Sequence, residues 1–340
     1  MDIQPGRITT KYIEHFNRKV LYLILLIILT LITALYAMAH GSYEIPVTDI
    51  LGSLTGSADH PAMIVITKIR MPRVISAIIS GWGLSLSGLC IQTLLKNPLG
   101  SPSTLGISQG AAFGAASAIV LFGSHALSLT AFAFGGALIS ILIILLLARL
   151  KRLTAEAIIL AGVALASLFT SATLMIQYFA TDIKLAMVVF WTFGDVGRSN
   201  WPEIAMMSAA TVMATIYLMV LRWDFNALTS GEETAMGLGV NVEGIRISGM
   251  LMVSVVSALV TAFLGVIAFA GLIAPHIARR MIGDDHRMLI PFSAVMGALL
   301  ILAADTLGRL AIGSGSLPVG VITSFLGAPM FLYLLIRGYQ

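Results

Sequence analysis

Arginines at the ends of apolar segments are the first residues of this sequence that could bind a partner. Arg70 and Arg73 flank Pro72, and Arg309 ends another apolar run, four residues after Asp305. A planar guanidinium binds carboxylates in bidentate fashion, so an outward ring of these arginines suits acidic side chains of a docking protein. Lipid phosphates are an equally good ligand for them, and Asp305 is placed as an intrahelical partner of Arg309.

The second candidate is the polar stretch 228–246, LTSGEETAMGLGVNVEGIR, between two long apolar runs. Ser230 lies three residues before Glu233, a capping-box spacing that predicts the start of a short helix. Gly239 offers a C-terminal stop, and Asn241 could cap a second helix. A contact surface for another protein and a connector capped for solubility fit these residues equally well.

Both candidates must be positioned by membrane helices. Of the 340 residues, 58% are hydrophobic and only 11% are charged, whereas soluble domains carry about 25% charged residues. Apolar runs of roughly 17 to 25 residues predict about ten helical spans. Their centres lie in 20–38, 73–95, 104–122, 127–148, 155–179, 202–221, 247–264, 267–282, 288–308 and 318–336. The prediction is an all-α, polytopic integral membrane bundle that forms a single transmembrane domain over residues 1–340.

Glycines inside the predicted spans indicate how these helices pack. Gly81, Gly83 and Gly88, followed by Gly110 and Gly114, form small faces on which neighbouring helices can approach closely. A tightly packed bundle is therefore expected.

Basic residues at the span ends give the orientation. With both termini inside, the cytoplasmic segments hold fourteen of the 20 lysines and arginines: Arg7, Lys11, Arg18, Lys19, Lys96, Arg149, Lys151, Arg152, Arg222, Arg246, Arg279, Arg280, Arg287 and Arg337. The outer side keeps six: Lys68, Arg70, Arg73, Lys184, Arg198 and Arg309. This excess supports an even number of spans and places residues 1–19 and 228–246 in the cytoplasm. The positive charge thus indicates orientation in the cytoplasmic membrane rather than nucleic-acid binding.

The sequence offers little chemistry of its own. The spans carry almost no ionisable residues, which disfavours the proton relay of an ion-coupled carrier, although Glu156 and Asp305 near span ends keep that class open. No Gly-Lys dipeptide occurs, so a phosphate loop is excluded. The lone Cys90 and the scattered histidines give no metal-ligand spacing. We therefore expect neither an enzyme nor a resident metal or cofactor, and active transport would draw its energy from another polypeptide.

An ordered set of motifs resembles one family. The motifs are Arg70-Met71-Pro72-Arg73, Gln92, Asn97-Pro98-Leu99, Leu105-Gly106-Ile107-Ser108, GEETAMGLG at 231–239, Gly271-Leu272-Ile273-Ala274-Pro275-His276, Asp285-His286-Arg287 and Gly327-Ala328-Pro329. Over about residues 15 to 337 the chain closely resembles the permease subunits of bacterial and archaeal ABC importers for ferric siderophores, haem and vitamin B12, which are type II importers. Many relatives have Glu where this chain has Ser316, so an outer-face role for that carboxylate is in doubt here.

The resemblance implies a permease that works as a dimer, here a homodimer, with two cytoplasmic ATPase subunits and an external substrate-binding protein. Arg70, Arg73 and Arg309 match positions that receive glutamates from the binding protein. The segment that matches the ATPase contact comprises Glu232, Glu233, Ala235, Gly237, Leu238, Gly239 and Val240. The fifth helix, near 155–179, matches the one that lines the central pathway. ATP and magnesium would belong to the partner ATPase.

The expected function is import of a metal chelate across the cytoplasmic membrane. Ferric siderophore is the first expectation, followed by haem or cobalamin, and an oxyanion is possible. The rival classes are an ion-coupled secondary transporter and a passive channel, which ATP-dependent uptake with a separate ATPase would distinguish.

Overall fold

The computed structural model describes residues 5–41, 44–55, 60–123, 126–150, 154–311 and 316–336. Helices and their connections make up these residues, and no strand occurs among them. Lys151, Arg152 and Arg337, which entered the charge count, lie outside the described residues, as do positions 1–4.

Ten helices coincide with the ten predicted spans. They are α1 (Pro5–Ala39), α4 (Met71–Leu94), α5 (Ile107–Ser117) with its continuation η2 (Ala118–Phe122), α6 (Ala126–Arg149), α7 (Ala155–Tyr178), α9 (Trp201–Val220), α12 (Val242–Leu264), α13 (Ala270–Ile282), α14 (His286–Ala311) and α15 (Val319–Ile336). Seven of the described helices are long and apolar enough to cross a membrane, and two more, at 107–122 and in α15, are shorter but apolar. α13, with 13 residues, is the shortest of the ten. The predicted all-α membrane bundle is confirmed.

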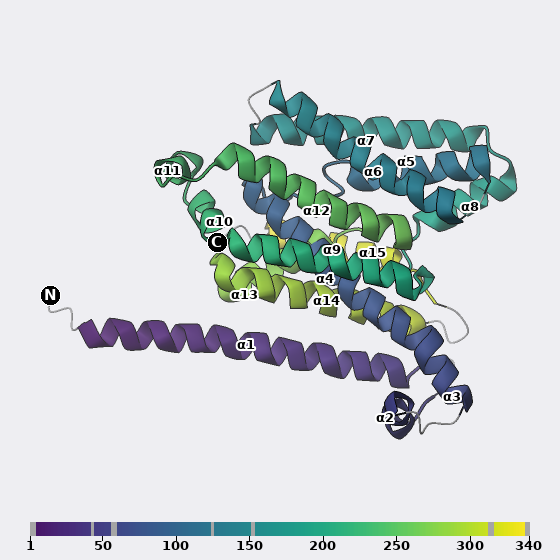
Figure 1. The fold of residues 1–340 in the computed structure, drawn as a ribbon, viewed down its shortest axis with the longest axis horizontal. Helices are drawn as coiled ribbons and strands as arrows, with labels where there is room; N and C mark the ends of the chain where they lie inside the picture. Colours follow the sequence, from purple (N-terminus) through teal and green to yellow (C-terminus); the bar gives the residue numbers. More distant parts are fainter. Residues whose placement is uncertain are drawn as a thin grey trace.

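Short helices lie at the two ends of the bundle. They are α2 (Val47–Thr55), α3 (His60–Ile64), η1 (Val65–Arg70), α8 (Asp182–Thr192), η3 (Val196–Arg198), α10 (Arg222–Thr229) and α11 (Glu232–Gly237). Figure 1 shows α10 and α11 at one end, on the side where α1 begins, and α2, α3 and α8 at the other. We call these the α11 end and the arginine end, because Arg70, Arg73 and Arg309 lie at the second. The sequence did not predict α2, α3, α8 or α10, since each is shorter than a membrane span.

α4 crosses the middle of the bundle and packs against α14, α12, α13 and α9. Glycines allow α4 to approach its neighbours closely. A Cβ atom on Gly88 would lie 1.6 Å from the carbonyl oxygen of Gly271 in α13, and one on Gly81 would lie 2.2 Å from that of Gly297 in α14. The prediction of close glycine packing is confirmed, because no larger residue fits at either crossing.

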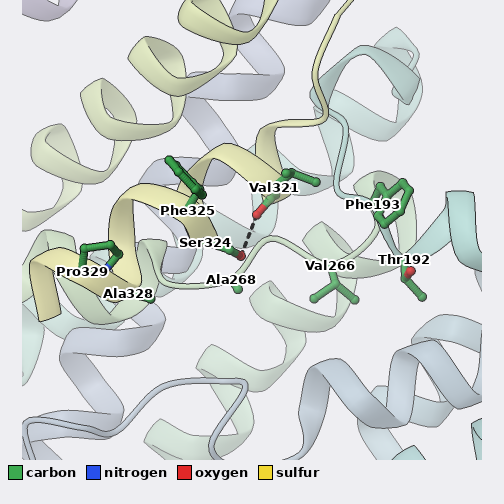
Figure 2. Close-up of a pocket in the computed structure, with 10 residues that line it drawn as sticks. Thr192, Phe193, Val266, Ala268, Val321, Ser324, Phe325, Ala328 and Pro329 are labelled. Atoms are coloured by element: carbon green, nitrogen blue, oxygen red, sulfur yellow. Dashed lines mark hydrogen bonds between the residues drawn. The ribbon is translucent and has the colours of Figure 1, made fainter. Parts of the chain in front are cut away.

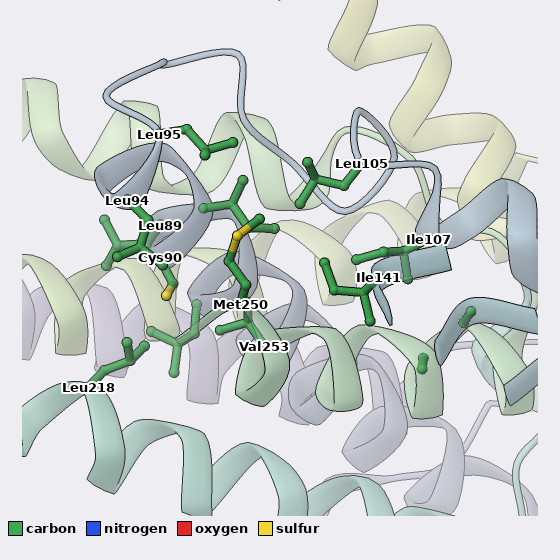
Figure 3. Close-up of a cluster of buried hydrophobic side chains, with 14 of the residues drawn as sticks. Leu89, Cys90, Leu94, Leu95, Leu105, Ile107, Ile141, Leu218, Met250 and Val253 are labelled. Carbon is green, nitrogen blue, oxygen red and sulfur yellow. The ribbon is translucent and has the colours of Figure 1, made fainter. Parts of the chain in front are cut away.

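Buried apolar side chains fill the space around the α11 end of α4 (Figure 3). Leu89, Cys90 and Leu94 of α4 lie in the same cluster as Met250 and Val253 of α12. Cys90 is a free, fully buried thiol, so it serves as a small apolar side chain here.

The chain turns between α12 and α13. Gly265, with a φ of +81°, ends α12, and Phe269, with a φ of +65°, precedes α13. The predicted division between spans 247–264 and 267–282 is therefore confirmed, and the turn divides one apolar stretch into two helices.

Candidate functional site

The start of α11 differs from the prediction. The expected capping box of Ser230 and Glu233 is wrong, because α10 extends through Thr229 and Ser230 caps its C-terminal end, with the Ser230 N–H donating to Ala227 at 3.1 Å. α11 begins after Gly231, whose φ of +131° is accessible to glycine and which provides no side-chain cap. The two acidic residues of the first turn, Glu232 and Glu233, still lie at the positive end of the helix dipole.

The end of α11 matches the prediction. Gly239 adopts a φ of +86°, its N–H donates to Met236 at 2.9 Å, and the Val240 N–H donates to Ala235 at 3.0 Å. This pair of bonds is the Schellman arrangement that satisfies the last carbonyls of a helix. Asn241 then caps α12, since its side chain accepts a hydrogen bond from the Gly244 N–H at 2.9 Å. Both predicted signals are confirmed.

α11 presents an apolar surface outward. Met236 is 56% exposed and Leu238 70% exposed, and a Cβ atom on Gly237 or Gly239 would meet no atom within 4 Å. Ala235, by contrast, is fully buried and holds the helix on the core. An exposed Met and Leu with two open glycines form a small surface onto which another protein can pack.

One ion pair ties α11 to the rest of the bundle. Glu232 bonds the guanidinium of Arg246 in α12, and Arg246 also reaches the carbonyl oxygen of Leu94, the last residue of α4, at 3.4 Å. Glu232 and Arg246 border a polar hollow of about 630 Å³, which Lys96 and Glu156 also line. The ion pair therefore links the position of α11 to the ends of α4 and α12.

The loop between α13 and α14 lies beside α10, an arrangement that sequence reasoning did not predict. Asp285 accepts hydrogen bonds from the Arg287 guanidinium at 2.8 Å and from the Asn226 amide of α10 at 3.1 Å. The Arg287 guanidinium is the main cause that lowers the pKa of Asp285 to about 2, with the Asn226 bond adding to it. The motif Asp285-His286-Arg287 was the available signal, but spacing alone does not reveal its partner 59 residues away in α10.

At the opposite end, Arg73 and Arg309 converge on Asp305. The Arg73 guanidinium donates hydrogen bonds to both carboxylate oxygens of Asp305 at 2.8 to 3.1 Å. Arg309, four residues after Asp305 in α14, lies 3.3 Å from the same carboxylate. Asp305 is completely buried, whereas Asp195, 3.4 Å from Arg73, is partly exposed. Pro72 occupies the first turn of α4, a position that proline favours, and so places Arg73 at the start of this helix.

Arg70 and Arg309 also cap the end of α1. The Arg70 guanidinium donates to the carbonyls of Met38 and Ala39, the second at 2.9 Å, and Arg309 donates to Ala37 at 3.0 Å. The last carbonyls of a helix lack intrahelical partners and carry partial negative charge, so cationic side chains stabilise them.

The structure thus brings the three predicted docking arginines together but turns them inward. The side chains of Arg73 and Arg309 are 15% and 12% exposed, and Arg70 is 5% exposed. The sequence indicated an outward ring, because it could not show that α1 and Asp305 already occupy the guanidiniums. Their role in docking stays a prediction.

Comparisons with known proteins agree with this architecture. A model of the FecCD transport family matches residues 26–337. The chain is 49% identical to the protein MJ0087 of Methanocaldococcus jannaschii, over 98% of this chain and 99% of the relative. It is 32% identical to the Fe(3+)-citrate import permease YfmE of Bacillus subtilis (94% and 96% covered), and 35% identical to the vitamin B12 import permease BtuC of Vibrio cholerae (81% and 84% covered).

A solved structure gives the same result. The fold matches a metal-chelate type ABC transporter in an inward-facing conformation with a TM-score of 0.85 at 30% identity, over 93% of this chain and 99% of the other. The chain therefore belongs to the FecCD transport family, whose members are membrane-embedded permeases of ABC importers.

Proposed function

We propose that this chain imports a metal chelate across the cytoplasmic membrane, powered by a separate ATPase that binds α11. The observation that carries the proposal is the exposed apolar surface of Met236 and Leu238 beside Gly237 and Gly239 at the end of a membrane bundle. α11 is exposed to a partner but is held on the bundle by the buried Ala235 and by an ion pair. A displacement imposed by the partner can therefore be transmitted to the bundle without detaching the helix.

In this proposal the α11 end faces the cytoplasm. The side where ATP is available then holds both chain termini and the segments 1–19 and 228–246, the second of which contains α11. ATP and magnesium belong to the partner subunit. ATP binding favours one arrangement of the permease only through a difference in affinity between its states, and α11 is the contact at which that difference is generated.

The arginine end then faces outward and receives a substrate-binding protein. Acidic side chains of that protein would meet Arg70, Arg73 and Arg309 at their exposed edges, beside the partly exposed Asp195. Because the guanidiniums already have partners within the chain, a docking carboxylate has to share or displace them. Docking of the binding protein would accordingly be sensitive to salt. Its affinity would be lower than that of a surface with three unpaired arginines.

A second copy of the chain would complete the pathway. α7 leaves Ser167, Thr170 and Ser171 exposed among apolar residues, and the hydroxyls of Ser167 and Thr170 donate to their own helix at 3.0 and 2.7 Å. Such a face is polar enough for water yet binds nothing tightly, which suits a large ligand in transit.

An apolar hollow of about 690 Å³ supports the same arrangement. Figure 2 shows it between the end of α8 (Thr192, Phe193), the linker before α13 (Val266, Ala268) and α15. Ser324 donates to Gly320 at 2.7 Å, so its hydroxyl is occupied within α15. We propose that the homodimer covers this hollow.

The names of the relatives support a metal chelate as the substrate. Ferric citrate and vitamin B12 are both metal centres wrapped in an organic ligand, and these are the substrates named for YfmE and BtuC. We place a ferric siderophore or ferric citrate first, with haem and cobalamin next.

Reconstitution into liposomes tests the proposal against an ion-coupled carrier and a channel. The permease, its ATPase and its binding protein would be supplied with radiolabelled ferric citrate, haemin or cobalamin as probes. We expect uptake of at least one chelate that requires both ATP and the ATPase. Uptake driven by a proton gradient without ATP would establish the ion-coupled carrier instead, and equilibration without either would establish a channel.

A further inference from the structure

Two helices, α4 and α14, contribute polar side chains at both ends of the bundle. At the arginine end, Arg73 in the first turn of α4 binds Asp305 near the end of α14. At the α11 end, Thr93 in the last turn of α4 lies 3.0 Å from His286, the first residue of α14. The same antiparallel pair is therefore bonded at each end by side chains from both of its helices.

The middle of the pair leaves no room for sliding. Gly81 and Gly297 approach so closely that a Cβ atom on either would lie 2.2 Å from the carbonyl oxygen of the other. The Ser85 hydroxyl donates to the Ser293 carbonyl at 2.7 Å, and both serines are completely buried. This is the most extensive helix–helix contact in the described part of the chain. Because packed interiors resist deformation, the pair should move as one body.

Asn226 fastens α10 to this pair. Its carbonyl oxygen accepts from the backbone N–H of His286 at 2.8 Å and lies 3.0 Å from Nδ1 of the same residue. An oxygen that accepts twice requires the ring proton on Nδ1. The Thr93 hydroxyl lies 3.0 Å from Nε2 and 2.9 Å from the Leu89 carbonyl oxygen of its own helix, and its single proton can be donated to either acceptor. His286 is 1% exposed and stacks on Phe225 of α10, with ring centroids 5.6 Å apart.

α11 follows α10 directly, so the contact of Asn226 with His286 also holds α11. A second contact of α11 reaches the same end of α4. Glu232 binds Arg246, and Arg246 reaches the carbonyl of Leu94, the residue after Thr93. Both attachments thus end on the last turn of α4.

We propose that the α4–α14 pair is the rigid link between the ATPase contact and the arginine end, and that Asn226, His286 and Thr93 are positioning residues that fasten α10 and α11 to it. This inference rests on the proposed function, in which α11 binds the ATPase and the arginine end receives the binding protein. A displacement of α11 then reaches the Arg73–Asp305–Arg309 cluster through two closely packed helices.

The test measures energetic coupling, because adjacency alone does not establish transmission. The affinity of the ligand-free binding protein for the permease–ATPase complex in nanodiscs would be measured with and without a non-hydrolysable ATP analogue. In the unmodified complex, ATP should change this affinity by about fivefold or more.

Thr93→Val removes the hydroxyl at nearly constant volume, and Thr93→Ser retains it as the matched control. We expect Thr93→Val to bind ATPase and binding protein, each measured alone, within about twofold of the unmodified chain, while the effect of ATP on docking falls to less than about twofold. Thr93→Ser should keep the full effect. A merely structural role would lower both docking affinities together and leave the effect of ATP intact.

The outcomes separate this inference from the proposed function. If the unmodified permease does not bind the ATPase, the proposed function fails. If it binds and Thr93→Val keeps the full effect of ATP, or if Thr93→Ser loses it equally, the link proposed here is overturned and the function stands. Should Thr93→Val fail to assemble, Asn226→Leu, which releases α10 from His286, carries the same expectation and the same criterion.

Discussion

The two ends of the molecule treat their candidate docking residues in opposite ways. At the α11 end, Met236 and Leu238 are exposed and the adjacent glycines have open space beside them. At the arginine end, Arg73 and Arg309 are buried around Asp305, and Arg70 binds the end of α1. A partner at α11 gains new contacts, whereas a partner at the arginines must compete with contacts that already exist. The first surface is suited to a lasting attachment and the second to a reversible one.

The largest loss of stability should come from removing Asp305, the carboxylate that Arg73 and Arg309 share. Asp305→Ala leaves Arg73 and Arg309 largely buried without their carboxylate, which should cost about 3–5 kcal/mol of stability. Thermal unfolding in detergent measures this loss. Asp195→Ala, which removes the partly exposed carboxylate and its bond to the Gly197 N–H, is the control and should cost about 1 kcal/mol. Equal losses would show that the arginines do not depend on the buried carboxylate, and the contrast between the ends would weaken.

A smaller effect is expected from blocking the exposed surface of α11. Gly237→Trp fits the chain itself, since a side chain there meets nothing within 4 Å, but it should obstruct the ATPase. We expect docking to weaken about 30-fold or more, equivalent to about 2 kcal/mol, with normal membrane insertion and with uptake lost. Met281→Trp, at an exposed position of α13, is the control for a bulky residue outside α11. Normal coupling in Gly237→Trp would remove α11 from the ATPase contact.

Two asparagines that cap helices allow the two ends of the bundle to be compared by equivalent substitutions. Asn241 caps α12 beside α11, and Asn200 forms a capping box with Glu203 at the start of α9, near the arginine end. Replacing either with Ala should cost about 1 kcal/mol of stability. Only Asn241→Ala should also lower uptake per assembled complex, because it loosens the chain that follows α11. A similar loss of uptake in both variants would argue that general stability, and not the position of α11, limits transport.

The smallest effect concerns acid sensitivity at the α11 end, because the ion pair of Arg287 and Asp285 is partly exposed and therefore screened by solvent. Arg287 lowers the pKa of Asp285 to about 2, below its ordinary value of about 3.9. A carboxyl with a lowered pKa in the folded state contributes stability that is complete above about pH 4 and is lost as the pH falls towards 2. Asp285→Asn should therefore flatten this part of the dependence of unfolding temperature on pH. Parallel curves for the two proteins between pH 4 and 2 would contradict the ion pair.

Local signals in the sequence predicted the local structure well. The ten spans follow from the length of the apolar runs, and the stop at Gly239 and the cap at Asn241 depend on bonds between residues three to five apart. The Ser230 cap failed because an unpredicted helix, α10, already used that residue. The short helices α2, α3, α8 and α10 were missed because each is shorter than a membrane span.

The burial of the arginines required the tertiary structure. Asp305 and Arg309 are four residues apart, so their ion pair could be predicted, but Arg73 reaches Asp305 across 232 residues and Arg309 reaches Ala37 across 272. The contacts of Asn226 with His286 and of Thr93 with His286 also join residues far apart in the chain, by 60 and 193 residues. The sequence by itself determined the membrane class, the spans, the family motifs and the polar stretch that became α11, because hydropathy and capping act over one helix or less. Only the packing of α1, α4, α10 and α14 decided which charges are exposed and which are bound internally, because that depends on which helix ends meet.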